Sequence, residues 1–371
     1  MPSYTFKMFV KLIIVWLSCS ITFIFTHSNE DLLEINRLGR TLNPITVYQN
    51  VCTTIFGQTG NCMDKISCVN VGGQVSGTCL SELKSCCYMS HKCSSVSSQN
   101  NTHFIGPDTP TSTGICTHTI RRLNENICQV RLDFEKFTLA GPGTLGNCDV
   151  DFLVISGGSP VPKLCGENTG QHVYIDFPTT TTELLLIVST QGAMVLRQWD
   201  VKVNQISCFD RLLAPKGCLQ YFTSGLGTLK SFNYVSSRGG RYTTNLEYSI
   251  CIRSQPGFCS ICYQQCDASP TSGSFFVSGT ALTSLNDGAN KDNCVSDFIM
   301  IPCGAAGTST ALPCQVNRFC GGTLAPNSGA AASAKVCSTV RPFQVTVFSD
   351  PTMTAADVQS GFCLTYFQNA C

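Results

Sequence analysis

A short cysteine-led pattern occurs twice in this chain and limits how it can fold. The first copy runs from Cys148 to Phe177 and contains CDVDFLVISGG, then LCGENTG, then HVYIDF. The second runs from Cys294 to Gly322 and contains CVSDFIMIPCG, then RFCGG. Each copy has Cys-x-x-Asp-Phe, three apolar residues, a loop, and an aliphatic or aromatic residue before Cys-Gly. The repetition indicates one structural unit present in two copies.

The cysteine content indicates an oxidising compartment. The 371-residue chain has 25 cysteines, and 24 remain when Cys19 of the N-terminal segment is set aside. An even, high cysteine count is typical of secreted proteins held together by disulfides. The alternative is a reduced, zinc-binding protein. However, the only Cys-x-x-Cys pair is Cys259-Ser-Ile-Cys262, and zinc sites of that kind need more such ligands.

The charge balance argues against a nucleic-acid partner. Charged residues make up only 13% of the chain, with 24 Lys and Arg against 23 Asp and Glu. A chain so close to neutral has no general electrostatic attraction for nucleic acid or for acidic lipid.

The N-terminus predicts a secretory signal peptide over residues 1–28. Lys7 and Lys11 precede an apolar run from Leu12 to Phe25, which is the arrangement of a basic region followed by a hydrophobic one. We expect cleavage near Thr26–Asn29 and a secreted, extracellular product with no membrane segment. A signal anchor is the alternative, although the run is short for a bilayer span.

Residues 29–50 contain no cysteine and are predicted to be a linker or propeptide. Arg37-Leu-Gly-Arg40 fits a minimal Arg-x-x-Arg site for a proprotein convertase. An ordinary linker that happens to hold two arginines is the other interpretation, and the sequence leaves cleavage open.

Residues 51–89 form a compact cysteine-rich head with the spacing C-x9-C-x5-C-x10-C-x6-C-C. So small a core needs covalent support. The order of cysteines resembles the clip domain of arthropod secreted proteins. That resemblance implies the pairs Cys52–Cys86, Cys62–Cys79 and Cys68–Cys87. A generic disulfide knot is the alternative, because six cysteines allow fifteen pairings.

Residues 90–208 and 209–371 are predicted to be two all-β sandwiches. Val130, Leu132 and Phe134 alternate with polar residues, as in a strand with one face toward solvent. The strands expected in the first repeat are Cys128–Phe137, Asp151–Ile155, His172–Phe177, Leu184–Ser189 and Trp199–Ile206. Those expected in the second are Thr228–Tyr234, Leu246–Arg253, Phe275–Ser278, Asp297–Ile301, Phe343–Phe348 and Phe362–Phe367.

These repeats resemble CUB domains, which are secreted β-sandwich modules. Besides Cys-x-x-Asp-Phe and Cys-Gly, the first repeat has VRLDFEKF at Val130–Phe137 and CTHTI at Cys116–Ile120, with His118 where the family usually has Trp. The second has FSD at Phe348–Asp350 and GF at Gly361–Phe362. Together with the head, the layout resembles arthropod secreted proteins with CUB domains.

The CUB resemblance implies a disulfide framework and leaves part of it open. The pairs that it implies, or that remain once those are assigned, are Cys93–Cys116, Cys148–Cys165, Cys128–Cys208, Cys218–Cys251, Cys294–Cys320 and Cys259–Cys371, with Cys303–Cys314 closing an insertion. The sequence leaves open the pairing of Cys262, Cys266, Cys337 and Cys363. Antiparallel strands would bring Cys266 close to Cys363.

Some CUB domains bind Ca²⁺ through a Glu and two Asp residues, and neither repeat has the full set. The Glu position reads Ala140 in the first repeat and falls near Ser278 in the second. Asp297 and Asp350 are therefore incomplete candidates for a metal site. The alternative is that both cap turns or bond to backbone amides. We expect no cofactor.

No pattern in the chain predicts catalysis. Gly-x-Ser-x-Gly and His-Glu-x-x-His are absent, and the Gly-x-Gly-x-x-Gly of residues 141–146 runs into Cys148 without the helix that a nucleotide site needs. The four histidines beyond the leader are expected at the surface or the edge of the core; they are His91, His103, His118 and His172.

By the CUB resemblance, we expect a non-catalytic protein that binds an extracellular protein or glycan through its loops. A regulator of a secreted serine-protease cascade and a structural component of matrix or cuticle are the alternatives. Asn100-Asn-Thr is the predicted N-glycosylation site.

Overall fold

The computed structural model describes residues 51–371 except 80–83, 110, 193–195, 237–239, 268–272, 278–293, 308–313, 328–331, 352 and 354–358. Residues Cys52–Cys371 form one compact unit. The predicted signal peptide, the linker or propeptide and the Arg37–Arg40 site lie outside the described residues. Ser278 does too.

The cysteine-rich head is a small sheet with one short helix. Its strands are β1 (Val51–Thr53), β2 (Thr59–Met63), β3 (Gln74–Thr78) and β4 (Ser85–Tyr88), in the order β1-β2-β4-β3. Helix α3 (Lys65–Asn70) begins after Asp64, whose side chain accepts a hydrogen bond from the Ser67 amide, as helix N-caps do. Cys68, Cys87 and Met89 form the core. The disulfides are Cys52–Cys86, Cys62–Cys79 and Cys68–Cys87, the pairs that the clip resemblance implies.

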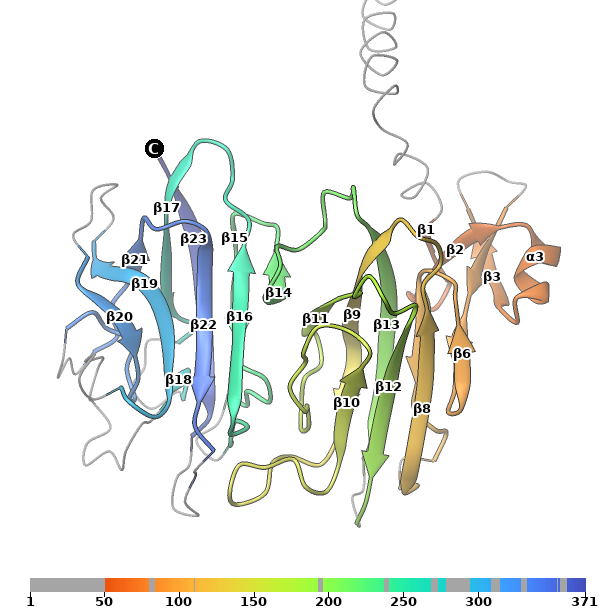
Figure 1. Ribbon diagram of the computed structural model, residues 1–371, viewed down its shortest axis with the longest axis horizontal. Helices are drawn as coiled ribbons and strands as arrows, with labels where there is room; N and C mark the ends of the chain where they lie inside the picture. The colour runs from red at the N-terminus through yellow and green to blue at the C-terminus, as the bar shows by residue number, and fades with distance from the viewer. Residues whose placement is uncertain are drawn as a thin grey trace, which may run out of the picture. The chain divides into compact units, whose positions relative to one another are not determined.

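The first repeat is a sandwich of a four-stranded and a five-stranded sheet (Figure 1). The orders are β10-β12-β8-β6 and β11-β9-β13-β7-β5. The strands are β5 (Ser90–His91), β6 (Ser95–Ser97), β7 (Thr102–Ile105), β8 (Gly114–Arg121), β9 (Ile127–Thr138), β10 (Phe152–Ser156), β11 (His172–Asp176), β12 (Glu183–Thr190) and β13 (Gln198–Ser207).

Strand β9 shows how sequence pattern becomes core. Val130, Leu132 and Phe134 are fully buried, as their alternation predicts. A register shift against β13 follows Phe134, and the next buried apolar side chain is Phe137, three positions later instead of two. This bulge changes which side chains face outward beyond that point.

The second repeat has the same strand order as the first. Its path is β14-β16-β22-β19-β21-β17-β23-β15, with β18 beside β23 and β20 beside β19. The segment β19-β22-β16-β14 corresponds to β10-β12-β8-β6, and β17-β23-β15 corresponds to β9-β13-β7. The strands are β14 (Cys218–Phe222), β15 (Leu226–Lys230), β16 (Leu246–Ile252), β17 (Phe258–Gln265), β18 (Phe275–Phe276), β19 (Phe298–Ala306), β20 (Val316–Phe319), β21 (Val336–Ser338), β22 (Phe343–Ser349) and β23 (Gly361–Ala370).

The duplication extends to an unusual detail of strand direction. In an otherwise mostly antiparallel arrangement, β6 runs parallel to β8 and β14 runs parallel to β16. In the second repeat, β21 pairs with both β17 and β19, so the two layers join into one continuous path. The chain is therefore all-β: two disulfide-linked sandwiches preceded by a small cysteine-rich domain.

Every cysteine from Cys52 onward is in a disulfide. The pairs in the two sandwiches are Cys93–Cys116, Cys128–Cys208, Cys148–Cys165, Cys218–Cys251, Cys259–Cys371, Cys262–Cys337, Cys266–Cys363, Cys294–Cys320 and Cys303–Cys314. Seven of them are the pairs that were expected, and Cys262–Cys337 and Cys266–Cys363 are the two that the sequence left open. Antiparallel strands were expected to bring Cys266 close to Cys363. Strands β17 and β23 are antiparallel, and Gln265 faces Leu364. This register places Cys266 opposite Cys363.

Several strand predictions differ from the structure, and two of the differences are instructive. Strand β15 ends at Lys230 instead of Tyr234, because Asn233 has a positive φ of 56° that an extended strand does not contain. Strand β17 is missing from the strands expected from alternation, although the expected disulfides placed an antiparallel strand next to Cys266. Its sequence, FCSICYQQ, buries Ser260 and Gln265, so hydrophobic alternation alone does not identify it.

Candidate functional site

The Cys-x-x-Asp carboxylate of the first repeat is fully buried and fully hydrogen-bonded. Asp151 is 1% exposed. Its Oδ2 accepts a hydrogen bond of 3.0 Å from the Ala140 amide, and its Oδ1 accepts one of 2.9 Å from the Gln191 amide. The residue that stands at the family's Glu position, Ala140, thus contributes its backbone to the same carboxylate.

A buried guanidinium completes this site. Arg197 is 2% exposed; its Nε donates to Asp151 Oδ2 at 2.7 Å and its Nη2 to Asp151 Oδ1 at 3.0 Å. Nη2 also donates to the carbonyl oxygens of Gln191 and Gly192. Although burial alone raises the pKa of Asp151, the hydrogen bonds from Arg197 and from the two amides outweigh it and hold the pKa below its usual range.

These residues do not fit a calcium ion. A fixed cation already occupies both oxygens of Asp151 in a bidentate pair, and Ca²⁺ needs six to eight oxygen ligands. Sequence reasoning missed Arg197. The sequence signal that could have identified it is a single arginine just before the expected strand Trp199–Ile206, in a chain with few charged residues.

The corresponding carboxylate in the second repeat has different partners. Asp297 Oδ2 accepts a hydrogen bond of 2.5 Å from the Tyr242 hydroxyl, and Oδ1 accepts one of 2.8 Å from the Asp350 amide. The two metal candidates, Asp297 and Asp350, are thus brought together. The contact between them runs from the Asp350 backbone amide to the Asp297 carboxylate, which matches the alternative for Asp297.

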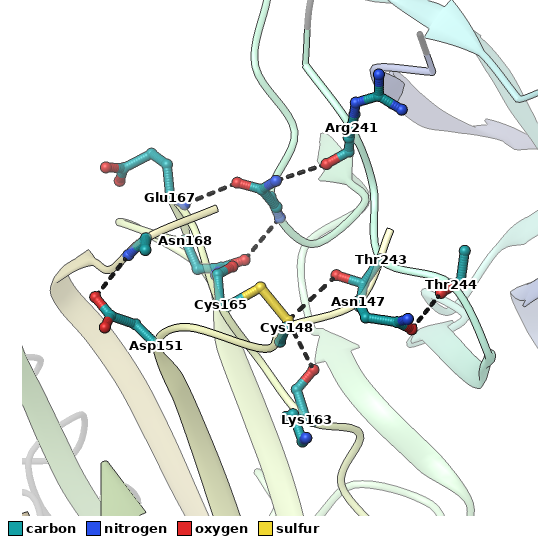
Figure 2. Close-up of a disulfide and its surroundings, with 12 residues drawn as sticks. Asn147, Cys148, Asp151, Lys163, Cys165, Glu167, Asn168, Arg241, Thr243 and Thr244 are labelled. Carbon is teal, nitrogen blue, oxygen red and sulfur yellow. Dashed lines mark hydrogen bonds between the residues drawn. A yellow bond between two sulfur atoms is a disulfide. The ribbon is translucent and has the colours of Figure 1, made fainter. Parts of the chain in front are cut away.

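The loop around the Cys148–Cys165 disulfide is held by the second repeat, as Figure 2 shows. The Glu167 amide donates to Asn233 Oδ1 at 2.9 Å. In the same cluster, Thr244 Oγ1 donates to Asn147 Oδ1 at 3.1 Å. The disulfide, together with the hydrogen bonds to Asn233 and Thr244 of the second repeat, therefore holds the loops at this end of the first sandwich.

The loops around these carboxylates also present apolar side chains to solvent. Val150 precedes Asp151 and is 42% exposed, and Leu196 precedes Arg197 and is 67% exposed. In the second repeat, Val295 of the Cys-x-x-Asp motif is 61% exposed. Exposed apolar side chains on loops that are held in place are typical of contact surfaces.

The expectation that the histidines lie at the surface or the core edge is wrong for three of the four. His103, His118 and His172 are buried. His118 stacks on Phe104 with ring centroids 5.1 Å apart, and serine hydroxyls lie against both of its nitrogens. The imidazole of His118 therefore fills the core at the position where CUB domains usually have Trp.

Burial keeps two of these rings neutral. Desolvation, followed by the nearby His91, lowers the pKa of His118 to about 4. Desolvation, followed by the charge of Arg131, lowers the pKa of His172 to about 4. His172 Nε2 lies 3.1 Å from both the amide nitrogen and the carbonyl oxygen of Tyr221, so the tautomer decides which of the two it bonds.

The predicted glycosylation site lies beside the head. Asn100 Oδ1 accepts a hydrogen bond of 2.7 Å from the Gln205 amide, and Asn100 Nδ2 donates to the Gln205 carbonyl at 3.2 Å. Asn61 of the head donates to the Asn100 carbonyl at 2.7 Å. A glycan on Nδ2 would still leave one N–H for the Gln205 carbonyl.

A family model described as the animal CUB domain matches residues 215–369. No curated protein matches the chain in a sequence search. In the part of the chain that the structure describes, no helix has the length and apolar character needed to cross a membrane.

Several solved structures are similar at low identity. The CUB1-EGF-CUB2 domains of rat MASP-1 match 73% of this chain and 99% of that chain, with 16% identity and a TM-score of 0.25. The MASP-1 CUB2 domain bound to Ca²⁺ matches 30% of this chain and 98% of that chain, with 20% identity and a TM-score of 0.26. The full extracellular region of zebrafish Gpr126/Adgrg6 matches 76% of this chain and 37% of that chain, with 11% identity and a TM-score of 0.27. At these TM-scores the solved structures carry no argument, and the likeness to the animal CUB domain is shown by the family model over residues 215–369.

Proposed function

We propose that this all-β chain, with two disulfide-linked CUB β-sandwiches behind a small cysteine-rich domain, is a secreted, non-catalytic protein that binds an extracellular protein or glycan. The observation that carries the proposal is the buried Asp151–Arg197 pair. It joins the loop before β10 to the loop before β13, and each loop exposes an apolar residue next to the pair.

The loops around Asp151 and Arg197 are pre-organised for binding. Binding costs the free energy of ordering whatever moves, so loops that are already fixed retain more of their contact energy. The Cys148–Cys165 disulfide, the Asp151 hydrogen bonds and the contacts from Asn233 and Thr244 fix these loops before any partner arrives. Val150 and Leu196 each place an exposed apolar side chain next to the Asp151–Arg197 pair, and exposed apolar side chains on fixed loops are typical of contact surfaces.

Binding at this end needs no calcium, because Arg197 supplies the positive charge at Asp151. The proposed surface therefore differs in mechanism from an ion-dependent one, in which the metal orders the loops. A chelator should leave partner binding through the first repeat intact.

The test is differential capture with the chain secreted by animal cells, whose recovery from the medium also checks that the predicted leader is removed. Immobilised chain is incubated with extracellular fluid, cross-linked and analysed by mass spectrometry. Leu196→Asp and Val150→Asp are expected to lose a partner that the unmodified chain retains in the presence of EDTA. The matched control is Val96→Asp on strand β6, at a residue 49% exposed. Equal capture by all three variants would contradict the proposed surface.

A second candidate function is regulation of a secreted serine-protease cascade. The observation that favours it is the pairing in the head, Cys52–Cys86, Cys62–Cys79 and Cys68–Cys87, which has the order of clip domains. The same capture experiment separates the two ideas, since a cascade regulator retrieves proteases. A matrix or cuticle protein would instead remain in the insoluble fraction.

A further inference from the structure

Three side chains that could bind a metal ion gather in the first sandwich, and none of them belongs to the Asp151–Arg197 site. His103 comes from β7, Glu135 from β9 and Asp200 from β13. His103 Nδ1 lies 2.8 Å from Asp200 Oδ1 and 3.8 Å from Glu135 Oε2. One donor atom from each residue lies within 4.8 Å of the other two.

The register of the sheet explains why these three meet. Strand β13 pairs with β9 on one side and with β7 on the other. Asp200 faces Lys136 and the next residue, Val201, faces Phe134. Glu135 is therefore the extra residue of a β-bulge. Bulges redirect side chains and are common beside functional sites, and this one directs Glu135 toward His103.

The cysteine-rich head holds the histidine from its other side. His103 Nε2 lies 3.1 Å from the carbonyl oxygen of Thr59, and a carbonyl can only accept a hydrogen bond. Nε2 must therefore carry a proton, which leaves Nδ1 to face the two carboxylates. Metal-binding histidines commonly donate their second N–H to a backbone carbonyl in this way. The Tyr88 ring covers the imidazole at 4.8 Å between centroids.

The burial of the three residues suits an ion that enters from one side. The side chains of His103 and Asp200 are 0% and 13% exposed, whereas that of Glu135 is 34% exposed. Solvent therefore reaches the cluster along Glu135. The opposite side is closed by Thr59 and Tyr88 of the head.

The geometry points to a site for Zn²⁺ formed by His103 Nδ1, Asp200 and Glu135. Zn–N and Zn–O bonds of about 2.0–2.2 Å in tetrahedral geometry separate ligand atoms by roughly 3.3 Å, and the observed 2.8 and 3.8 Å bracket that value. An imidazole with two carboxylates suits Zn²⁺ better than Ca²⁺ or Mg²⁺, which prefer oxygen alone. Bound there, Zn²⁺ would lock the head against the sandwich through the Thr59 contact.

No cysteine from Cys52 onward can compete with this cluster for a metal ion. The sulfurs of Cys52, Cys62 and Cys79 also lie close together, but all three are in disulfides and offer no thiolate. Among the described residues, the His103 cluster is thus the candidate metal-binding set whose ligand atoms are not tied up in disulfides. The competing interpretation of the 2.8 Å contact is an ion pair between a protonated His103 and Asp200. In that case Glu135 is not a ligand.

The test uses the untagged, full secreted chain, stripped of metal with a chelator and titrated with Zn²⁺ by calorimetry. One Zn²⁺ per chain is expected, with a rise in the melting temperature from mass action. Because loss of a second-sphere partner already costs about 10- to 100-fold in metal affinity, Asp200→Asn should weaken binding at least that much. Glu135→Gln, at a half-exposed position that should not disturb folding, should also weaken it.

Glu183→Gln is the control, because Glu183 is an exposed carboxylate of the same repeat paired with Arg121. It should bind Zn²⁺ like the unmodified chain. Co²⁺ provides a second readout, since its visible spectrum reports a low-coordinate nitrogen and oxygen site. Absence of stoichiometric Zn²⁺ binding would overturn the inference. So would unchanged affinity in both Glu135→Gln and Asp200→Asn, which would leave only an ion pair.

Discussion

The two sandwiches share a strand order and a Cys-x-x-Asp loop but satisfy the loop carboxylate differently. In the first, Asp151 pairs with the buried Arg197. In the second, Asp297 takes hydrogen bonds from the Tyr242 hydroxyl and the Asp350 amide. The fold therefore requires that this buried carboxylate have partners, since an unpaired buried charge is costly. The described partners differ: a buried guanidinium in the first repeat, and a tyrosine hydroxyl and a backbone amide in the second.

Removal of Arg197 should produce the largest effect. Arg197→Met leaves Asp151 as an uncompensated buried charge, which should cost about 3–5 kcal/mol of unfolding free energy. Tyr242→Phe removes one hydrogen bond to a charged group and should cost about 1.5–3 kcal/mol in the second repeat. Guanidinium unfolding followed by Trp199 fluorescence measures the first, because Trp199 is the only tryptophan beyond the leader and is buried in the first sandwich. Circular dichroism follows the second.

The double variant Asp151→Leu with Arg197→Met is the control for that comparison. It removes both charges, so much of the lost stability should return. If Arg197→Met alone unfolds like the parent chain, the ion pair is not what stabilises these loops.

Acid should weaken the first repeat before the second. His118 and His172 have pKa values lowered from 6.5 to about 4 by burial, whereas no histidine occurs after residue 172. Protonation at these sites favours the unfolded chain, so their stabilisation is complete above pH 6.5 and is lost as the pH falls toward 4. Each shift corresponds to about 3 kcal/mol when fully lost. Urea unfolding by Trp199 fluorescence at a series of pH values measures the slope.

His118→Gln sharpens the acid comparison. The variant keeps a hydrogen-bonding side chain near Ser95 and Ser97 but does not titrate, so its stability should vary less between pH 6.5 and 4. An unchanged slope would show that other groups, such as paired carboxylates, govern the acid response.

Calcium should have the smallest effect, and only on the second repeat. Asp297 and Asp350 lack a complete oxygen set, so we expect a dissociation constant in the millimolar range or weaker. At a concentration equal to that constant, stabilisation is only about 0.4 kcal/mol. Calorimetric titration of the full chain with Ca²⁺ is the measurement. Micromolar binding that disappears in Asp297→Ala would show that the second repeat has a working ion site after all.

Prediction from sequence succeeded where the signal was local or repeated. The alternation in Val130–Phe137 identified β9, and the paired motifs identified two sandwiches of one type. It failed where burial depended on distant neighbours. Strand β17 lacks alternation because Ser260 and Gln265 face the interior. Arg197 was not recognised because its partner, Asp151, lies 46 residues away along the chain.

The sequence by itself determined the all-β class, the duplication and the number of cysteines available for pairing, because strand period, repeats and composition are properties of the chain in one dimension. Only the tertiary structure decided which polar groups are buried and with whom. The β9 bulge directs Glu135 toward His103, the head closes over that histidine, and the two aspartates of equivalent loops acquire different partners. These outcomes depend on contacts between strands far apart in sequence, and no local pattern encodes them.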